Sequence, residues 1–358
     1  MTSYHRHRLN ELSTDDLHRW VQLQEETPEL DSPFFRPEFA RAVDAVRNDV
    51  EVVVVKQQGE PVAFFPFQRD RLGTGRPVGG PLSGCQGVIA RRTTMFDPLA
   101  LLDACGTTAW KFDHLVTHQT PLAPYHSHFE AAPYIDLSQG FAAYRAARRK
   151  AGSQRISKIL SRARKVEREH GHLELVPHAN DVEVLNTLVR WKRQQYRRTG
   201  LTDVFNYPWT LALLEHLLTH PAADLEPMLT LLCAGDAPVA ISYGLRSRGV
   251  LYGWFTAFDR AYARYGPGMM MAVLMAQAVV PLGVRRIDLG KGDDEFKLRL
   301  MSDSFTLASG TLTAPSLTNS IRAGVRQSIN WARTTPLAAP VEIPLRMTQR
   351  LRDWLVLQ

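Results

Sequence analysis

The 358-residue sequence has only three cysteines, Cys85, Cys105 and Cys233, and they lie far apart without a CxxC pair. This spacing predicts neither a disulfide framework nor a zinc knuckle, so we expect three reduced, buried thiols. No apolar run approaches the ~20 residues that a membrane span requires, and the N-terminal residues lack the apolar core of a secretory signal. Together these absences predict a cytoplasmic protein.

Several signatures of enzyme classes are also missing. The sequence contains no GxSxG, no HExxH, no P-loop GxxxxGK[ST] and no GxGxxG in a strand-to-helix setting. His126 and His128 form an HxH pair without a third ligand at helical or hairpin spacing, so a solvated loop is favoured and no metal is predicted. Covalent catalysis by Cys233 is disfavoured because this residue lies in an apolar run.

The composition is that of an ordinary globular protein, with 44% hydrophobic and 22% charged residues. The length exceeds one average domain and predicts two. A net charge of +7 and a pI near 9.4 suit an anionic partner such as a coenzyme, RNA, an acidic glycan or a membrane surface. Charge alone does not choose among these partners, although no DNA-binding role is predicted.

Two similar runs of elements indicate a duplicated unit. The order helix, helix, hairpin, Gly-rich turn, helix, strand is predicted for residues 10–116 and, with more antiparallel strands, again for residues 181–289. We therefore predict an α/β (α+β) protein with an N-terminal domain over residues 1–133 and a C-terminal domain over residues 134–315. Residues 316–358 are predicted to form a basic amphipathic tail, for which packing across the two domains is favoured over peripheral membrane contact.

Between the predicted domains, residues 118–133 are rich in His and Pro and indicate a connection, followed by a strand over residues 134–137. Residues 141–170 then predict a strongly basic helical segment with apolar positions at helical period. This segment is consistent with a cationic surface that binds phosphate or an acidic polymer. A solvated helix face is the alternative. Its cationic residues are Arg148, Arg149, Lys150, Arg155, Lys158, Arg162, Arg164, Lys165 and Arg168.

The stretch Arg-Tyr-Gly-Pro-Gly-Met-Met-Met at 264–271 follows a predicted strand, 250–258, and opens an apolar helix. Gly266 permits a tight turn, Pro267 suits a first helical position, and Gly268 allows close approach to the backbone. An exposed helix N-terminus of this kind can bind a pyrophosphate without a lysine. A turn without a ligand explains the same residues equally well. The amides expected to be unpaired are those of Gly268, Met269 and Met270.

A second group of polar residues follows the predicted strand 285–289. Alternation along that strand presents Asp288 at its end, where the carboxylate could accept a proton from an attacking amine or hydroxyl if burial raises its pKa. Lys297 could stabilise charge on a thioester oxygen or contact coenzyme phosphate, and pairing with Asp293 or Asp294 is the equally weighted alternative. The adjacent acidic residues point different ways, which indicates capping or acceptor binding rather than a metal site.

Two segments resemble a known family. They are Trp-Phe-Thr-Ala-Phe-Asp-Arg-Ala-Tyr-Ala-Arg-Tyr-Gly-Pro-Gly at 254–268 and Ile-Asp-Leu-Gly-Lys-Gly-Asp-Asp-Glu-Phe-Lys at 287–297. They resemble the GNAT-type acetyltransferases of the CelD/BcsL class, linked to bacterial cellulose and exopolysaccharide production. The N-terminal half resembles the degenerate partner domain of such chains and of FemAB-like peptidyltransferases. The usual GNAT phosphate loop has Arg or Gln at the position of Ala263, and Arg264 is a possible substitute.

The resemblance implies tandem GNAT-like domains, each a mixed, mainly antiparallel sheet flanked by helices, with acetyl-CoA or another acyl-CoA as donor. We predict an N- or O-acyltransferase in which a sugar, nucleotide sugar or glycan acceptor attacks the thioester directly. The alternatives are FemAB-like aminoacyl transfer from charged tRNA, gripped by the basic segment, and a non-catalytic scaffold of a polysaccharide assembly. The predicted site residues are Tyr265, Gly266, Pro267, Gly268, Met269 and Met270 for the coenzyme, Asp288 and Lys297 for catalysis, and Trp191, Tyr243, Trp254 and Asp293 for the acceptor.

Overall fold

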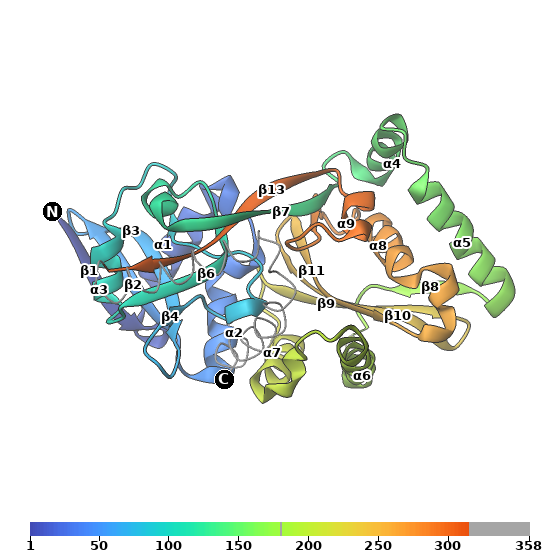
Figure 1. Cartoon of the computed structure of the whole chain (residues 1–358), viewed down its shortest axis with the longest axis horizontal. Helices are drawn as coiled ribbons and strands as arrows, with labels where there is room; N and C mark the ends of the chain where they lie inside the picture. The colour runs from blue at the N-terminus through green and yellow to red at the C-terminus, as the bar shows by residue number, and fades with distance from the viewer. Residues whose placement is uncertain (180, 315–358) are drawn as a thin grey trace, which may run out of the picture. The chain divides into compact units, whose positions relative to one another are not determined.

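The computed structural model describes residues 1–179 and 181–314 (Figure 1). The described residues divide into two compact units, of which unit 1 contains residues 1–28, 43–128 and 308–314 and unit 2 contains residues 29–42 and 129–307. The predicted domain boundaries stay a prediction, and these two units exchange short segments that the boundaries do not include. The predicted tail, 316–358, lies outside the described residues.

Unit 1 is built on an antiparallel meander in which β2 pairs with both β1 and β3. β3 also pairs with two short strands, β4 and β5, and β4 pairs in parallel with β6. The elements of this unit are β1 (Thr2–Arg8), α1 (Thr14–Glu25), β2 (Glu51–Gln57), β3 (Glu60–Arg69), β4 (Gly75–Arg76), η4 (Gly80–Leu82), β5 (Ile89–Ala90), α3 (Pro98–Ala104), β6 (Ala109–Val116) and η5 (Thr120–Tyr125).

The predicted hairpin between β2 and β3 is confirmed. Gln58 and Gly59 at its tip both have positive φ, 55° and 91°, which matches the right-handed twist of the flanking strands. Aromatic residues then cover both faces of β3, because neighbouring side chains alternate along a strand. Phe64 stacks on Trp20 of α1 at 5.4 Å between ring centroids, and Phe65 packs on Trp110 at 4.9 Å.

Unit 2 contains a mainly antiparallel sheet in the order β8-β9-β10-β11-β12-β7, in which only the β11–β12 pair is parallel. β7 neighbours β13, and these two strands and α2 each contribute residues to both units. The elements are η3 (Pro33–Phe35), α2 (Pro37–Arg47), β7 (His126–Asp136), α4 (Gly140–Lys150), α5 (Arg155–His170), β8 (Leu173–Val176), α6 (Val182–Thr199), η6 (Val204–Asn206), α7 (Pro208–Thr219), β9 (Glu226–Ala234), β10 (Ala237–Ser247), β11 (Val250–Phe258), η7 (Arg260–Tyr265), α8 (Pro267–Ala278), β12 (Arg286–Asp288), α9 (Glu295–Leu300) and β13 (Asp303–Thr313).

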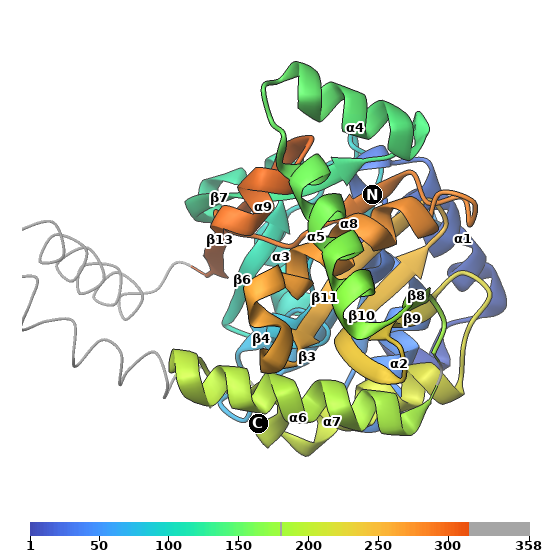
Figure 2. The same ribbon diagram turned by 90° about the vertical axis from the view of Figure 1, so that its right-hand side faces the viewer.

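Helices cover both faces of the unit 2 sheet. α5 and α8 share a buried cluster with Leu251 and Ile287 on one face, whereas Tyr243 reaches α7 on the other face through a hydrogen bond to the Leu214 carbonyl (Figure 2). This mixed sheet flanked by helices confirms the predicted fold class. It also places α8 after β11, as the sequence predicts, with the short helix η7 between them.

The structure departs from the sequence-based expectations in three places. The basic segment 141–170 is two helices, because Gly152 adopts a positive φ of 80° between α4 and α5. The expected connection over residues 118–133 contains η5 and the first half of β7. The strands β1 and β13 were not expected, because β1 has the polar sequence Thr-Ser-Tyr-His-Arg-His-Arg and shows no apolar alternation.

Candidate active site

The N-terminus of α8 has the turn geometry that its sequence predicts. Gly266 is left-handed, with φ 71° and ψ 54°, and Pro267 is the first helical residue. The Met270 amide donates to the Gly266 carbonyl at 3.1 Å, so the expectation that it points outward unpaired is wrong. Within the described part of the chain, no acceptor bonds to the amides of Gly268 and Met269. The helix end therefore offers a pair of open donors and not three.

The space outside these two amides is accessible. Gly268 and Met269 are half-buried, and a Cβ atom added to Gly268 would meet nothing closer than the Phe258 ring at 3.8 Å. A Cβ atom on Gly266 would lie 3.4 Å from Nη1 of Arg162, so an exposed guanidinium of α5 stands beside the turn. An anion at this helix end would thus meet main-chain donors, the helix dipole and a side-chain charge.

Arg162 was named in the sequence only as one of many cations, and its position beside the turn was not predicted. The sequence gives only a weak indication that Arg162 lies beside the turn. It lies next to Ala163 on α5, within the buried stripe of Ile159, Ala163 and Val166 that packs α5 into the cluster containing α8. A residue at the border of a packed stripe can reach the neighbouring helix, but periodicity does not say which neighbour it meets.

Tyr265, the residue before the turn, is fixed to α5. Its side chain is buried, and its hydroxyl donates to the Glu169 carboxylate and accepts from Arg264, while Nε2 of His170 lies 2.9 Å away. The hydrogen bond to Glu169 raises the pKa of the Tyr265 hydroxyl. Arg264 is paired with Glu169 at 3.5 Å. These contacts direct the Tyr265 hydroxyl toward α5 and hold the turn in place.

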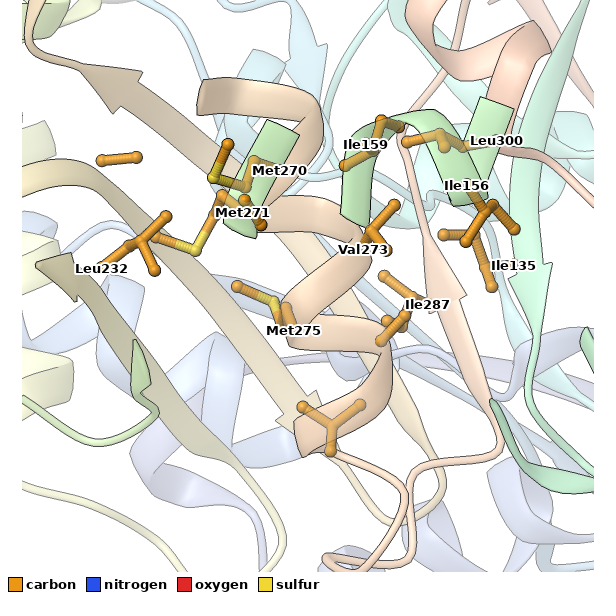
Figure 3. Packing of buried hydrophobic residues seen from close by; sticks show 14 of the residues in the cluster. Ile135, Ile156, Ile159, Leu232, Met270, Met271, Val273, Met275, Ile287 and Leu300 are labelled. Carbon is orange, nitrogen blue, oxygen red and sulfur yellow. The ribbon is translucent and has the colours of Figure 1, made fainter. Parts of the chain in front are cut away.

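The interior of α8 anchors its exposed end. Met270, Met271 and Met275 are buried in the cluster that includes Leu232 and Ile287 (Figure 3). Burying side chains of this size stabilises the folded state by about 1.5–3 kcal/mol each. The helix axis is therefore fixed against the sheet, and the open amides point from a rigid element.

The strands β11 and β12 part at Tyr252. They pair in parallel from Val250 with Arg286 to Tyr252 with Asp288, where β12 ends, while β11 runs on to Phe258. Among the described residues no strand takes the place of β12 on this edge of β11. A register shift against β10 between Tyr243 and Gly244 leaves Trp254 as an extra, bulged residue on β11. β11 thus continues beyond Tyr252, beside the start of α8, without a neighbouring strand on this edge among residues 1–179 and 181–314.

Asp288 stands at the end of β12, as the sequence predicts, but its carboxylate is engaged. The residue is 1% exposed and accepts hydrogen bonds from Nε and Nη2 of Arg286 at 2.8 and 3.3 Å. Arg286 also donates to the Asp31 carbonyl. Burial raises the pKa of the Asp288 carboxyl, and the Arg286 charge opposes that shift. Its role as a base stays a prediction, to which the structure adds an unforeseen partner.

Lys297 is buried beneath the loop that follows β12. Its ammonium donates to the Lys291 carbonyl at 2.6 Å and pairs with Asp294 at 2.9 Å, which is the pairing that the sequence left open. The Lys291 ammonium pairs with Glu130 at 2.8 Å, and Asp293 is exposed. The loop is therefore held by two ion pairs, with Asp293 on its outer side.

The predicted acceptor residues are only partly brought together. Trp254 lies 6.1 Å from Tyr243 and 5.8 Å from Phe34 between ring centroids. Tyr243 is fully buried, and its hydroxyl donates to the Leu214 carbonyl. Within the described residues, Trp191 and Asp293 take no part in this ring cluster. Of the rings in this cluster, the sequence predicted Tyr243 and Trp254 as acceptor residues but not Phe34 of η3.

The structure also bears on the cysteines, on membrane spans and on metal sites. Cys85 and Cys105 are buried, as expected, and burial raises the pKa of the Cys105 thiol to about 12, while Cys233 is half-buried. In residues 1–179 and 181–314, no helix is both long and apolar enough to cross a membrane. The same residues contain no group of three His, Cys, Asp or Glu side chains placed to hold a metal ion.

Comparison with known proteins identifies a family that part of the chain matches. Residues 153–298, which contain α5, α8 and β12, match the family described as "Acetyltransferase (GNAT) domain". This part of the chain is therefore similar to GNAT acetyltransferase domains. The predicted assignment as an acyltransferase is thereby confirmed at the level of reaction type, whereas the CelD/BcsL class is not supported by any match.

Solved structures extend the likeness to both units. FemX superposes with a TM-score of 0.57 at 10% identity, over 89% of this chain and 99% of that chain. The C-terminal domain of a putative lysylphosphatidylglycerol synthetase from Agrobacterium fabrum gives 0.52 at 11% identity, over 86% and 95%. A tandem GNAT protein from the clavulanic acid biosynthesis pathway gives 0.51 at 10%, over 88% and 100%. At identities this low, the superpositions show a shared fold only. No curated protein matches the chain.

Proposed function

We propose that this protein transfers an acyl group from acyl-CoA, in the first instance acetyl-CoA, to a nitrogen or oxygen of its acceptor. One observation carries the proposal: in the region that matches a GNAT domain, the open amides of Gly268 and Met269 stand near Arg162 and near the end of β11, past the point where β12 stops. A thioester carrier with a diphosphate needs these two features together, because it has an anionic end and an extended amide-containing arm.

The donor would bind in two parts. Its diphosphate accepts hydrogen bonds from the Gly268 and Met269 amides and faces the positive end of α8, which carries about half an elementary charge. The Arg162 guanidinium adds a full charge. The extended arm lies along β11 beyond Tyr252, where its amides pair with main-chain groups as an added strand would. This arrangement brings the thioester to the bulge at Trp254.

The reaction would be direct attack of the acceptor on the thioester carbonyl. Positioning, removal of one proton and stabilisation of the developing negative charge are sufficient for this chemistry. We assign proton removal to Asp288, which becomes available when the acceptor takes the place of Arg286 at its carboxylate. Lys297 supplies positive charge from beneath the loop that follows β12. Trp191, Tyr243, Trp254 and Asp293 stay proposed as acceptor contacts.

For the acceptor we propose a sugar, nucleotide sugar or glycan of cell-envelope or exopolysaccharide synthesis, with the enzyme in the cytoplasm. This part rests on the motif resemblance to the CelD/BcsL class. The half-buried Trp254 ring is compatible with stacking on a sugar face. Exposed acidic Asp293 could bind sugar hydroxyls.

A second candidate is aminoacyl transfer from charged tRNA. It is favoured by the dense positive charge of α4 and α5 and by the fold shared with FemX. Neutralising several phosphates would make such binding fall steeply with salt. The exposed cations of these helices are Arg145, Arg149, Lys150, Lys158, Arg162, Arg164, Lys165 and Arg168.

Two substitutions at one position test the donor site. Gly268→Ala should bind acetyl-CoA almost as wild type does, because a Cβ atom there has room. Gly268→Trp should weaken binding at least about 100-fold, because the indole fills the space over the helix end. Isothermal titration calorimetry measures both. Wild-type binding that is absent, or that Gly268→Trp leaves intact, would contradict the proposal. Tight, salt-sensitive tRNA binding would favour the second candidate. If the protein binds neither acetyl-CoA nor tRNA, a non-catalytic scaffold would be favoured.

A further inference from the structure

The positive charge of the chain is concentrated in one short segment. Residues 140–166, which form α4 and most of α5, contain nine lysines and arginines and no aspartate or glutamate. Because the formal net charge of the whole chain is only +7, the remaining residues include more acidic than basic side chains. The basic balance of the protein therefore originates in α4 and α5, and an anionic partner would be attracted to these helices.

The charges of α4 and α5 are on the surface, and the protein neutralises few of them. Within residues 1–179 and 181–314, Lys165 is the one exposed cation of these helices that pairs with a carboxylate, at 3.7 Å from Glu169. The exposed cations that no described carboxylate neutralises are Arg145, Arg149, Lys150, Lys158, Arg162, Arg164 and Arg168. Their charge is available to an anion outside the protein.

α4 contacts the rest of unit 2 along one narrow stripe. Tyr144 is buried, and Phe141 and Arg148, one turn before and after it, are half-buried. The residues between and after these three are all exposed, and they are alanines and cations: Ala142, Ala143, Arg145, Ala146, Ala147, Arg149 and Lys150. This outward face has no acidic side chain, and the long side chains of its cations can extend past the short alanines toward a charged layer.

Large apolar side chains are exposed on a helix that contacts α4. Phe296 and Leu298 of α9 are 43% and 44% exposed. The C-terminal end of α9 is held by α4, because Arg148 donates to the Arg299 carbonyl at 3.4 Å and Tyr144 donates to the next carbonyl at 2.6 Å. α9 also packs against α5 (Figure 2). Cations and exposed apolar side chains therefore occur together on α4, α5 and α9.

A partner that accommodates both kinds of side chain is an anionic phospholipid membrane. Its headgroups attract lysine and arginine, and the apolar layer beneath them accepts phenylalanine and leucine. RNA also attracts cations and stacks on aromatic rings, but it provides no apolar environment for Leu298 or for the alanines of α4. Since no helix of the described residues is long and apolar enough to cross a membrane, the contact would be peripheral.

We propose that unit 2 docks on the anionic surface of a membrane through α4, α5 and α9. The cations of α4 and α5 contact headgroup phosphates, while Phe296 and Leu298 enter the interface between the headgroups and the acyl chains. The inference goes beyond the proposed acyltransferase function, because it depends on surface residues outside the donor site. Arg162 of α5 stands beside the turn at Gly266, so docking would hold a donor bound there close to the membrane.

Vesicle sedimentation tests the selectivity of this surface. At low salt, the full chain should bind vesicles of phosphatidylglycerol and phosphatidylcholine, mixed in equal parts, at least about ten-fold more tightly than vesicles of phosphatidylcholine alone. Binding to the anionic vesicles should weaken as salt is added, because counterions screen the attraction. Equal affinity for both vesicles, or binding to neither, would overturn the proposal.

Charge substitutions test whether α4 makes the contact. Arg145→Gln/Arg149→Gln should weaken binding to the anionic vesicles at least about 20-fold, since each cation near such a surface contributes about five-fold to affinity. Arg197→Gln/Arg198→Gln removes the same charge from the exposed C-terminal turn of α6 and should weaken binding less than about three-fold. Similar losses for the two variants would indicate a general effect of net charge and would contradict docking through α4.

Apolar substitutions separate membrane docking from binding by charge alone. Phe296→Ser/Leu298→Ser should weaken vesicle binding about ten-fold, because both side chains lose an apolar environment. Val182→Ser/Leu201→Ser removes two other exposed apolar side chains of unit 2 and should leave binding unchanged. Unchanged binding of the α9 variant would overturn the docking proposal. A second result against it would be tight tRNA binding by wild type that Arg145→Gln/Arg149→Gln abolishes, with no vesicle binding.

Failure of this inference can be distinguished from failure of the proposed function. Acetyl-CoA affinity, measured by calorimetry, should be the same for wild type and for Arg145→Gln/Arg149→Gln, because neither residue belongs to the proposed donor site. If wild type binds acetyl-CoA but not anionic vesicles, only the docking proposal is wrong. If it binds anionic vesicles but not acetyl-CoA, the docking proposal stands and the proposed function is wrong. Circular dichroism should show that all four variants are folded, since their substitutions are at exposed positions.

Discussion

Each unit contains a left-handed glycine followed closely by a proline, but the helices that follow the two turns differ in length. In unit 2, Gly266 has a φ of 71° and precedes the twelve-residue helix α8. In unit 1, Gly79 has a φ of 73° and precedes η4, which has only three residues. A long helix carries a dipole and an exposed set of amides, whereas a single 3-10 turn carries neither to the same extent.

Glutamine side chains add a second difference. The Gly79 amide donates to Oε1 of Gln68 at 2.8 Å, and the Asp113 and His114 amides donate to Oε1 of Gln86 at 2.9 Å. In unit 1, therefore, side chains of the protein bind main-chain donors that a ligand could otherwise use. Unit 2 leaves the Gly268 and Met269 amides open. A glycine turn becomes a candidate binding site only where nothing in the fold already occupies its donors.

The largest expected effect comes from removing one of the glutamine side chains that bind main-chain donors in unit 1. Gln86 is buried, and Gln86→Leu would leave the Asp113 and His114 amides without their acceptor. We expect a loss of about 2–5 kcal/mol in the free energy of unfolding, measured by urea denaturation, because each orphaned buried group costs about 1–3 kcal/mol. Acetyl-CoA affinity of the folded variant should not change. Gln22→Leu, on the exposed side of α1, is the control, and a loss of similar size there would refute this explanation.

A second contrast is that unit 2 keeps the cation Lys192 half-buried on α6, and no carboxylate of the described residues pairs with it. Lys192→Met should raise the free energy of unfolding by about 1–3 kcal/mol at pH 7. Because burial lowers the pKa of Lys192 to about 8, the folded state disfavours the proton that the unfolded chain keeps until about pH 10.5. Wild-type stability should therefore rise relative to Lys192→Met between these pH values. Thermal melts of both proteins from pH 6 to 10 would show a constant gap if burial does not shift this lysine.

Removing the side-chain charge beside the open turn should reduce affinity and leave stability intact. Arg162→Gln is expected to weaken acetyl-CoA binding about ten-fold, with a smaller dependence on salt, because one charge–phosphate contact is lost. The free energy of unfolding should stay within about 0.5 kcal/mol of wild type, since the residue is exposed. Calorimetry at two salt concentrations measures the effect. Arg164→Gln on the same helix is the control, and an equal loss for both variants would indicate a general charge effect.

The smallest expected effect concerns the support of the turn. Tyr265→Phe removes the hydroxyl that joins Glu169, Arg264 and His170 and keeps the ring in place. We expect a loss of about 1 kcal/mol in stability and a three- to ten-fold weaker affinity for acetyl-CoA. Differential scanning fluorimetry and calorimetry give the two numbers. A stability loss with unchanged affinity would show that the hydroxyl holds α5 without shaping the donor site.

Much of the fold follows from patterns within short stretches of sequence. Alternation and turn chemistry predict the β2–β3 hairpin, and Gly266 and Pro267 predict the start of α8. The same rules place Asp288 at the end of a strand. They fail for β1, whose polar residues pair with β2 at an edge, and at Gly152, where one glycine separates two basic helices that share a helical pattern. Residue propensities predict neither the strand β1 nor the break at Gly152, because both depend on contacts with other parts of the chain.

The sequence by itself determined the local elements, the tandem organisation and the glycine turn, because hydrophobic period and backbone sterics act between near neighbours. Only the tertiary structure decided which distant groups meet, such as Arg162 with the turn at Gly266 and Arg286 with the Asp31 carbonyl. Side chains that converge from distant positions leave no periodic mark in the sequence. Their electrostatic and packing free energies depend on distance in space, which the chain acquires only when it folds.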